Sequence, residues 1–590
     1  MIDAIDPSAV PPAAVVAVAA LLAPFLSRRS GYALGALALA AVAGWALVVP
    51  EGVGATATFL GFEVLLVAVD DVTRLVALIF GGFGIGAVAY AYFAGADRIH
   101  LAVALGYVAA AVWTVSVGDW LGLVIGWELM AVASTLLVWL HGGAAVRAGY
   151  RYALAHALGG GLLLSGVAAH LATVGIAPDA LHFDGTGVAA GVPTLAVGLG
   201  VGLNAAVIGL HGWLPDTYHR PHVAASVFLC AYTTKAAVYA AYRTFPEGNL
   251  VLAYAGGAMA VYGAAYALAQ KDMRRLLAYH IQAQVGYMLA GIGVGSALGV
   301  AGGFAHLFNN VLYKGLLFMV AGIVVLRTGE NRLDRFGALG TTAPVVLAAF
   351  LVAALSITAV PGFNGFVSKG MVLDAAAAAG AEPLRWLLLA GAVGTFASFL
   401  KFGYYAFLEG DPVTVRDASA GHAAVVLPIA GLCVVLGLSY DALFAVLPAT
   451  EAWSTDPYSR SHVLEGVALA AAGLAAFVLG KPAFDRLHGG VDVDRIHDPA
   501  VFYGTRAISE GVARTYRAVD DLTAGVGWAS ARAVRDPVRT IRSHLPASHR
   551  DWYDRRRDRT PGRTGLKAGI STSVYVVIVL LAITLAVAHL

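Results

Sequence analysis

The residues of this chain that could do chemistry are charged side chains placed inside apolar segments. Lys235 lies in the apolar segment 223–242, which is long enough to cross a bilayer as a helix. An ionised side chain at such a depth costs roughly 2.5–3.5 kcal/mol, so residues of this kind mostly line a path for ions. Upstream of it, Pro215 and the polar run DTYHRPH interrupt apolar sequence on both sides. This interruption predicts unwound backbone that faces protein or a water-filled cavity.

A carboxylate lies in a second apolar segment, where Glu128 occurs in LGLVIGWELMAVAST. One interpretation is a neutral glutamic acid that only hydrogen-bonds to a neighbouring helix. The other is a carboxylate that exchanges protons or cations, and this is favoured because intramembrane acids mostly line ion paths.

His306 and Lys314 lie eight residues apart in FAHLFNNVLYKGLLF, with Asn309 and Asn310 between them. Eight helical steps of about 100° return to the same face, so both side chains should point the same way. His306 alone could be a polar residue that packs two helices together. With Lys314 on the same face, the pair predicts a route for protons through intervening water.

A second interruption occurs in VPGFNGFVSKG, where Pro361 and two glycines break an apolar run and Lys369 follows. Two interrupted segments, each late in a block of five helices, indicate an inverted structural repeat with an ion site at each break. Lys401 lies near a predicted helix end, from which its side chain can snorkel, and we predict a structural role for it.

Composition places the whole chain in a membrane. It is 59% hydrophobic and only 13% charged, with a mean hydropathy of +0.76. These values, and about fifteen apolar stretches near the length of a spanning helix, predict an all-α, multi-pass protein of the cell membrane. The stretch starting at Pro12 follows an acidic start, so we expect a retained helix and not a cleaved signal.

The cysteine and histidine content argues against redox chemistry in the chain itself. Cys230 and Cys433 are the only cysteines, which excludes a four-cysteine iron–sulfur cluster. Five histidines in or near apolar segments could in principle bind haem, but nothing marks a facing pair: His141, His156, His170, His211 and His280. We predict no cofactor, no metal site and no catalytic residue, and no binding of nucleic acid.

The chain divides into five predicted regions. These are N-terminal transmembrane helices with an external hairpin (1–99), a core of two inverted repeats (100–410), additional transmembrane helices (411–480), a basic amphipathic lateral segment broken near Pro537 (481–568) and a last transmembrane helix (569–590). In the lateral segment Lys and Arg outnumber Asp and Glu by 17 to 11. Elsewhere Lys and Arg concentrate in alternate loops, which predicts that those loops face the cytoplasm and that the N-terminus lies outside.

Several segments, in order, resemble the antiporter-like subunits shared by Mrp-type sodium/proton antiporters and respiratory complex I. They are GWELMAVAS, GLHGWLPDTYHRPHVAAS, TTKAAVYAAYRTF, QKDMRRLLAYHIQAQVGYMLAGIG, HLFNNVLYKGLLFMVAG and VPGFNGFVSKG. The third is most similar to the D subunit of Mrp antiporters. The resemblance implies two inverted five-helix repeats and a central polar axis through Glu128, Lys235, His306, Lys314 and Lys369. The lateral segment with the last helix is similar to that of the complex I subunit at the end of the membrane arm.

Two positions depart from the family's pattern. Asn204 stands where the family has a lysine in the first broken helix, and Asn310 stands where it often has a second histidine. Without the first lysine, Glu128 lacks its basic partner. We therefore expect that Glu128 either pairs with Lys235 or is protonated at neutral pH and serves as a proton-loading site.

The sequence leaves more than one function open. The first is the ion-translocating subunit of a multisubunit antiporter, with other membrane subunits, H⁺ and Na⁺ as partners. The second is the proton-pumping subunit of a complex I or membrane hydrogenase assembly. An enzyme subunit with its own redox centre, and a scaffold whose buried charges are vestigial, are the remaining alternatives.

Overall fold

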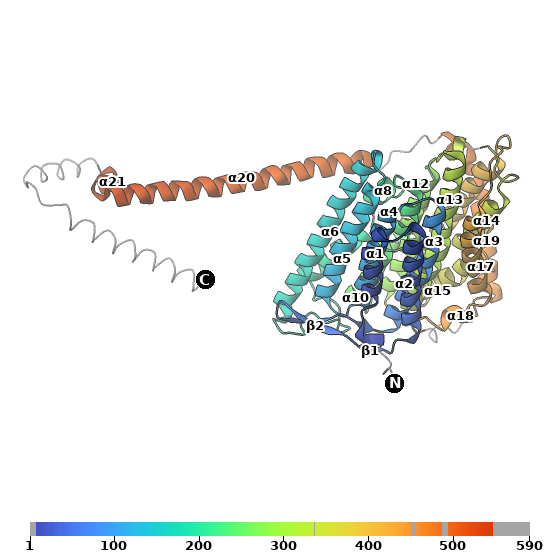
Figure 1. Cartoon of the computed structure of the whole chain (residues 1–590), viewed down its shortest axis with the longest axis horizontal. Helices are drawn as coiled ribbons and strands as arrows, with labels where there is room; N and C mark the ends of the chain where they lie inside the picture. Colours follow the sequence, from blue (N-terminus) through green and yellow to red (C-terminus); the bar gives the residue numbers. More distant parts are fainter. Residues whose placement is uncertain (1–6, 336, 450–455, 487–493, 545, 547–590) are drawn as a thin grey trace, which may run out of the picture. The chain divides into compact units, whose positions relative to one another are not determined.

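The computed structural model describes residues 7–335, 337–449, 456–486, 494–544 and 546. The chain forms two compact units, Met1–Val493 and Asp494–Leu590. The first is a bundle of roughly parallel and antiparallel helices (Figure 1). Within the described residues, eleven helices are long and apolar enough to cross a membrane. The predicted all-α, multi-pass fold class is confirmed.

The chain begins with three helices and a small β region: α1 (Pro12–Leu22), α2 (Arg28–Val48), strands β1 (Gly52–Val53), β2 (Thr56–Phe59), β3 (Phe62–Leu65) and β4 (Ala68–Val69), and α3 (Asp71–Phe93). Helices α2 and α3 start at capping side chains, because Ser27 and Asp70 accept hydrogen bonds from backbone N–H groups of the first turn. Strands β2 and β3 pair antiparallel. The hairpin predicted for this stretch is therefore present.

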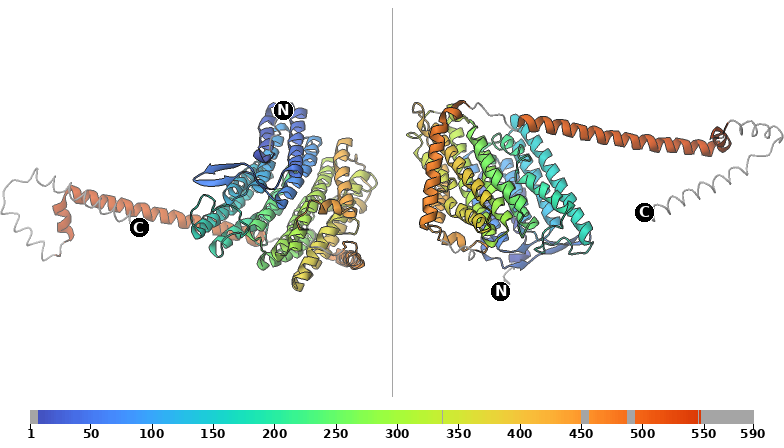
Figure 2. Two further views of the ribbon diagram at one scale, coloured as in Figure 1. Left: turned by 90° about the horizontal axis from the view of Figure 1, so that it is seen from below. Right: turned by 180° about the vertical axis from the view of Figure 1, so that it is seen from behind.

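Two blocks of five helices follow, each with an interrupted fourth helix. Figure 2 shows the helices of both blocks packed side by side in one bundle, the first coloured blue to green and the second green to yellow. The first contains α4 (Arg98–Ser116), α5 (Trp120–Trp139), α6 (Ala144–Val174), α7 (Val192–Asn204) with α8 (Trp213–Thr217), and α9 (Val223–Leu229) with α10 (Thr233–Thr244). The second contains α11 (Leu250–Leu268), α12 (Met273–Val294), α13 (Ala297–Thr328), α14 (Pro344–Ile357) with α15 (Asn364–Ala378), and α16 (Glu382–Gly403). The bundle ends with α17 (Ala420–Leu438), α18 (Asp441–Phe444) and α19 (Arg460–Arg486).

Both interruptions have the same backbone signature. After α7, Ala206 has a φ of 58°, and after α14, Ala359 has a φ of 60°. A non-glycine residue in this left-handed region is strained by roughly 1–2 kcal/mol, so the surrounding packing must hold it there. The same local strain at both breaks supports the predicted repeat.

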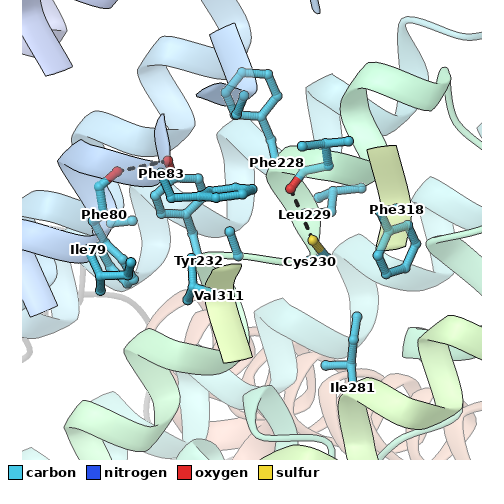
Figure 3. Packing of buried hydrophobic residues seen from close by; sticks show 14 of the residues in the cluster. Ile79, Phe80, Phe83, Phe228, Leu229, Cys230, Tyr232, Ile281, Val311 and Phe318 are labelled. Carbon is cyan, nitrogen blue, oxygen red and sulfur yellow. Dashed lines mark hydrogen bonds between the residues drawn. The ribbon is translucent and has the colours of Figure 1, made fainter. Parts of the chain in front are cut away.

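A third interruption corrects the prediction of one continuous helix over 223–242. The helix ends at Leu229 and restarts at Thr233, and Figure 3 shows Cys230 and Tyr232 packed at this point among Phe80, Phe83 and Phe318. The hydroxyl of Tyr107 on α4 accepts a hydrogen bond from the backbone N–H of Thr233 at 2.9 Å. A side chain from a distant helix therefore satisfies the backbone group that the break releases.

Loops predicted to share one side of the membrane are joined to one another. At one end, Lys271 pairs with Asp334 at 3.1 Å and Arg274 donates to the carbonyl of Pro221 at 2.9 Å. At the other end, the N–H of Glu63 donates to the carbonyl of Pro178 at 2.8 Å. The basic loops therefore gather at one end of the bundle, as the alternation of charges requires.

The second unit contains α20 (Asp494–Arg535) and α21 (Pro537–His544). The amphipathic helix and its break next to Pro537 agree with the prediction. Apolar residues on α20 are largely exposed within this unit, with Val512 at 50%, Tyr516 at 69% and Val526 at 59%. Helix α19 continues to Arg486, past the predicted boundary at 480. The last predicted helix (569–590) lies outside the described residues.

The strained alanines give a test of the fold. We expect Ala206→Gly and Ala359→Gly each to stabilise the protein by up to about 1 kcal/mol, because glycine adopts a positive φ without steric cost. Ala205→Gly is the matched control, since Ala205 has a φ of −75° and gains nothing from glycine. Thermal unfolding in detergent measures the difference. Equal melting temperatures for Ala206→Gly and Ala205→Gly would show that the backbone of Ala206 is not strained.

Candidate functional site

The predicted axis residues lie deep in the bundle, with one exception. Lys235, His306 and Lys314 are fully buried, and Lys369 is 2% exposed. Asn204 and Asn310 are also fully buried. Of the two prolines, Pro215 is buried in α8 and Pro361 is partly buried in the turn before α15. The exception is Glu128, which is partly exposed on α5.

Two of the buried lysines bind carbonyl groups that the helix interruptions leave free. The ammonium of Lys235 donates to the carbonyl of Cys230 at 2.8 Å, at the break between α9 and α10. The ammonium of Lys369 donates to the carbonyl of Ile357 at 2.8 Å, at the end of α14. Carbonyls at a helix C-terminus carry partial negative charge, so they partly compensate the ammonium for the loss of water.

His306 is the centre of a polar cluster in the second block. Its Nδ1 lies 3.0 Å from the Ser368 hydroxyl, and its Nε2 lies 3.1 Å from Oε1 of Gln284 and 3.2 Å from the Tyr313 hydroxyl. Ser368 immediately precedes Lys369, and Tyr313 immediately precedes Lys314. The cluster therefore joins the sequence neighbours of two lysines, although His306 and Lys314 lie two turns apart on α13.

Glu128 does not occupy the position that the expected pairing required. Its carboxylate lies against the backbone of Gly160 on α6, where a Cβ built on Gly160 would come within 1.7 Å of Oε1. Among the described residues, no ion pair or hydrogen bond joins it to Lys235. Of the two outcomes expected for Glu128, the structure does not contain the pairing with Lys235, and protonation of Glu128 stays a prediction. The pairing is absent because Lys235 is already bound to the Cys230 carbonyl inside the bundle.

A chain of hydroxyl groups, which the sequence analysis missed, lies between α5 and Lys235. The Tyr152 hydroxyl on α6 donates to Ser134 on α5 at 2.9 Å and lies 3.4 Å from the Thr233 hydroxyl. Thr233 is two residues before Lys235 and is also 2.7 Å from the Tyr107 hydroxyl. Hydroxyl groups both donate and accept, so they can relay protons. Serine, threonine and tyrosine are too common in apolar helices for the sequence alone to single out these four.

Asn204 is buried at the end of α7 without a hydrogen bond from either side-chain atom to any described residue. Nε2 of His156 on α6 is also buried without a hydrogen bond to any described residue. The His156 ring stacks on the Tyr152 ring, with the two centroids 3.9 Å apart. Buried polar groups of this kind require a water molecule or an ion as partner. The first break therefore has a polar lining, although Asn204 stands where the resemblance implies a lysine.

Lys401 contacts the protein backbone instead of snorkelling. It is only 5% exposed. Its ammonium donates to the carbonyls of Leu268 and Gln270, at 2.6 and 2.8 Å, at the C-terminal end of α11 and just beyond it. These contacts fit the structural role expected for it. Among the described residues, no group of three or more His, Cys, Asp or Glu side chains could hold a metal ion.

Comparison with known proteins identifies the class to which this arrangement belongs. Residues 117–398 match the family described as NADH:quinone oxidoreductase/Mrp antiporter, TM. An uncharacterized protein of Methanocaldococcus jannaschii is 31% identical over 344 residues, which are 55% of this chain and 71% of that protein. The chain belongs to this family. The match spans all five residues of the predicted axis.

Individual relatives come from both branches of the family. The D subunit of the Na(+)/H(+) antiporter of Alkalihalophilus pseudofirmus is 28% identical over 55% of this chain and 70% of that protein. The N subunit of the NADH-quinone oxidoreductase of Desulforudis audaxviator is 35% identical over 36% of this chain, but the chain covers only 44% of that protein. The structure of the Mrp complex from Dietzia sp. DQ12-45-1b matches with a TM-score of 0.75 and 25% identity, over 89% of this chain and 62% of that chain.

The contact between Glu128 and Gly160 gives a test of the carboxylate's role. Gly160→Ala should displace the carboxylate, because its Cβ would overlap Oε1, and ion exchange by the assembled complex should fall at least about tenfold. Gly161→Ala is the matched control, since nothing lies within 4 Å of a Cβ at Gly161. The measurement is the rate of ion exchange in vesicles that contain each variant. Equal rates in the two variants would show that the position of Glu128 is unimportant.

Proposed function

We propose that this chain is the ion-translocating subunit of a multisubunit Na⁺/H⁺ antiporter in the cell membrane. Protons or Na⁺ move along the path of Glu128, Lys235, Lys314, His306 and Lys369, and the basic loops face the cytoplasm. The observation that carries the proposal is that three lysines and a histidine are buried in interrupted or polar helices, with no carboxylate of a described residue bound to them. Buried positive charge without a carboxylate partner is costly and is retained where ions move.

Between the two sequence relatives named above, the extent of the match favours the antiporter over a redox-driven pump. The chain covers 70% of the D subunit of an antiporter, but 44% of the N subunit of a quinone oxidoreductase. The pump subunit of an oxidoreductase stays the second candidate because that relative has the higher identity, 35%. Purification of the tagged native complex separates the two. Sodium-dependent exchange without quinone reduction supports the antiporter, and quinone-linked proton transport supports the pump.

Lys235 provides the direct test of the pathway. In Lys235→Ala, exchange should fall to the level of vesicles without the complex, because the route loses the buried cation that follows the first break. The control is Lys401→Ala, which removes another buried lysine that binds backbone carbonyls. Both variants should lose a comparable stability, roughly 1–3 kcal/mol, from the carbonyls left unpaired. Only Lys401→Ala should keep exchange per assembled complex, and normal exchange in Lys235→Ala would refute the pathway.

Helix α20 is proposed to lie along the cytoplasmic membrane face, where it binds a neighbouring subunit or anionic headgroups. Its apolar residues are largely exposed, and Arg506, Glu510 and Arg514 form ion pairs at i,i+4 spacing along it.

Truncation after Arg486 tests this role, because it removes α20 and leaves α19 whole. The truncated protein should still insert in the membrane, but the complex should assemble poorly and migrate at lower mass on native gels. A complex of unchanged mass and amount would contradict the proposed role of the helix in assembly.

A further inference from the structure

The break between α9 and α10 decides which group the Cys230 carbonyl can bind. In a continuous helix this carbonyl would accept a hydrogen bond from the backbone N–H of Thr234, four residues on. Here it accepts from the ammonium of Lys235 at 2.8 Å. The carbonyl is therefore available to Lys235 only while the helix stays open at this point.

Tyr107 on α4 stabilises the open form of the helix. In a continuous helix the backbone N–H of Thr233 would donate to the carbonyl of Leu229. It donates instead to the Tyr107 hydroxyl at 2.9 Å, and the hydroxyl oxygens of Tyr107 and Thr233 lie 2.7 Å apart. Both residues are fully buried, so bulk water does not compete for this N–H. A buried N–H without an acceptor is costly, and the hydroxyl on α4 removes that cost from the open helix.

The direction of the neighbouring hydrogen bonds leaves the Tyr107 oxygen able to accept. The Ser134 hydroxyl donates to the Met130 carbonyl at 2.6 Å, and the Tyr152 hydroxyl donates to Ser134 at 2.9 Å. Each hydroxyl has a single proton, so Thr233 donates to Tyr152 at 3.4 Å and accepts from Tyr107. The proton of Tyr107 is thus used on the Thr233 hydroxyl, and its oxygen accepts the backbone N–H.

The residue before Thr233 is anchored on α3. The Tyr232 hydroxyl donates to the Phe80 carbonyl at 3.1 Å (Figure 3). The Tyr232 ring packs edge-on against Phe80 and Tyr107, with centroids 4.9 and 5.6 Å away. Gly84 leaves the space for this contact, because a Cβ there would lie 2.8 Å from the Tyr232 hydroxyl oxygen. Two neighbouring helices therefore hold the break, and α4 supplies the acceptor for its backbone.

We propose that Tyr107 is a positioning residue for ion translocation: its hydroxyl keeps the helix open at Cys230, and the free Cys230 carbonyl holds the ammonium of Lys235. Without the hydroxyl, the N–H of Thr233 regains an acceptor only when the helix closes onto the preceding turn. Closure brings the N–H of Thr234 to the Cys230 carbonyl and displaces the ammonium. The part that Lys235 plays in translocation rests on the proposed function, whereas the geometry of the break does not.

The contact between Cys230 and Lys235 can be measured directly, because the chain has only two cysteines. In a Cys433→Ala background, cysteine labelled with ¹³C at the carbonyl marks Cys230 alone. Lysine labelled with ¹⁵N at Nζ supplies the second nucleus, and solid-state NMR of the full chain in lipid measures the dipolar coupling between the two. A bond of 2.8 Å from Nζ to the carbonyl oxygen keeps the carbonyl carbon within about 4 Å of Nζ, close enough for a measurable coupling.

We expect this coupling in the Cys433→Ala chain and its loss in Tyr107→Phe. Tyr90→Phe is the matched control and should keep the coupling, because Tyr90 is also fully buried and its hydroxyl donates to the Met319 carbonyl at 3.2 Å. Thr233→Val should keep it too, since valine has the N–H that Tyr107 accepts but no hydroxyl. Coupling that is absent from the Cys433→Ala chain, retained in Tyr107→Phe, or lost in either of the other two variants would overturn the positioning role.

Exchange by the assembled complex then tests the consequence for transport. Tyr107→Phe should lower the rate at least about tenfold, and Tyr90→Phe should leave it within about twofold. Each variant loses one buried hydroxyl, so a general loss of stability would lower both rates alike and would count against the proposal. If Tyr107→Phe loses the coupling but exchanges normally, the pathway through Lys235 is refuted while the positioning of its ammonium stands.

Discussion

The bundle depends on a bond between a buried ammonium and a backbone carbonyl that a terminating helix leaves free. Lys235 binds the carbonyl of Cys230, Lys369 that of Ile357, and Lys401 those of Leu268 and Gln270. A continuous helix has no carbonyl to offer, because each one is already bonded four residues on. An interrupted helix exposes several, at the end where the helix dipole is negative. Helix breaks and buried lysines thus stabilise one another.

Such breaks persist only because neighbouring helices hold them. Ala206 and Ala359 adopt a left-handed backbone that alanine disfavours. At the third break, Tyr107 supplies the acceptor for the N–H of Thr233. Irregular backbone at membrane depth is tolerated only inside protein, and the buried residues around these positions provide that environment. The helix breaks that hold the buried lysines therefore depend on the same helix packing that stabilises the bundle.

The two halves of the chain use the shared architecture differently. At the second break, Lys369 gives a cation next to the His306 cluster. At the first, Asn204 supplies only an amide, and Lys235 belongs to the following helix. The intervening space is lined by hydroxyl groups of Ser134, Tyr152 and Thr233. Glu128 lies on the partly exposed surface of α5, so the polar groups next to Lys235 in the first half are uncharged hydroxyl groups.

The sequence by itself determined the all-α membrane class, the β-hairpin, the two main interruptions and the burial of the axis lysines. These features follow from composition, from proline and glycine, and from charges within apolar runs, all of which act locally. The tertiary structure decided the break at Cys230, the hydroxyl chain and the carbonyl partners of Lys235, Lys369 and Lys401. It also decided the separation of Glu128 from Lys235, whose pairing was one of the two outcomes expected from the sequence. Each of these depends on contacts between helices that lie far apart in the chain, and such contacts leave no periodic signal in either of the segments that make them.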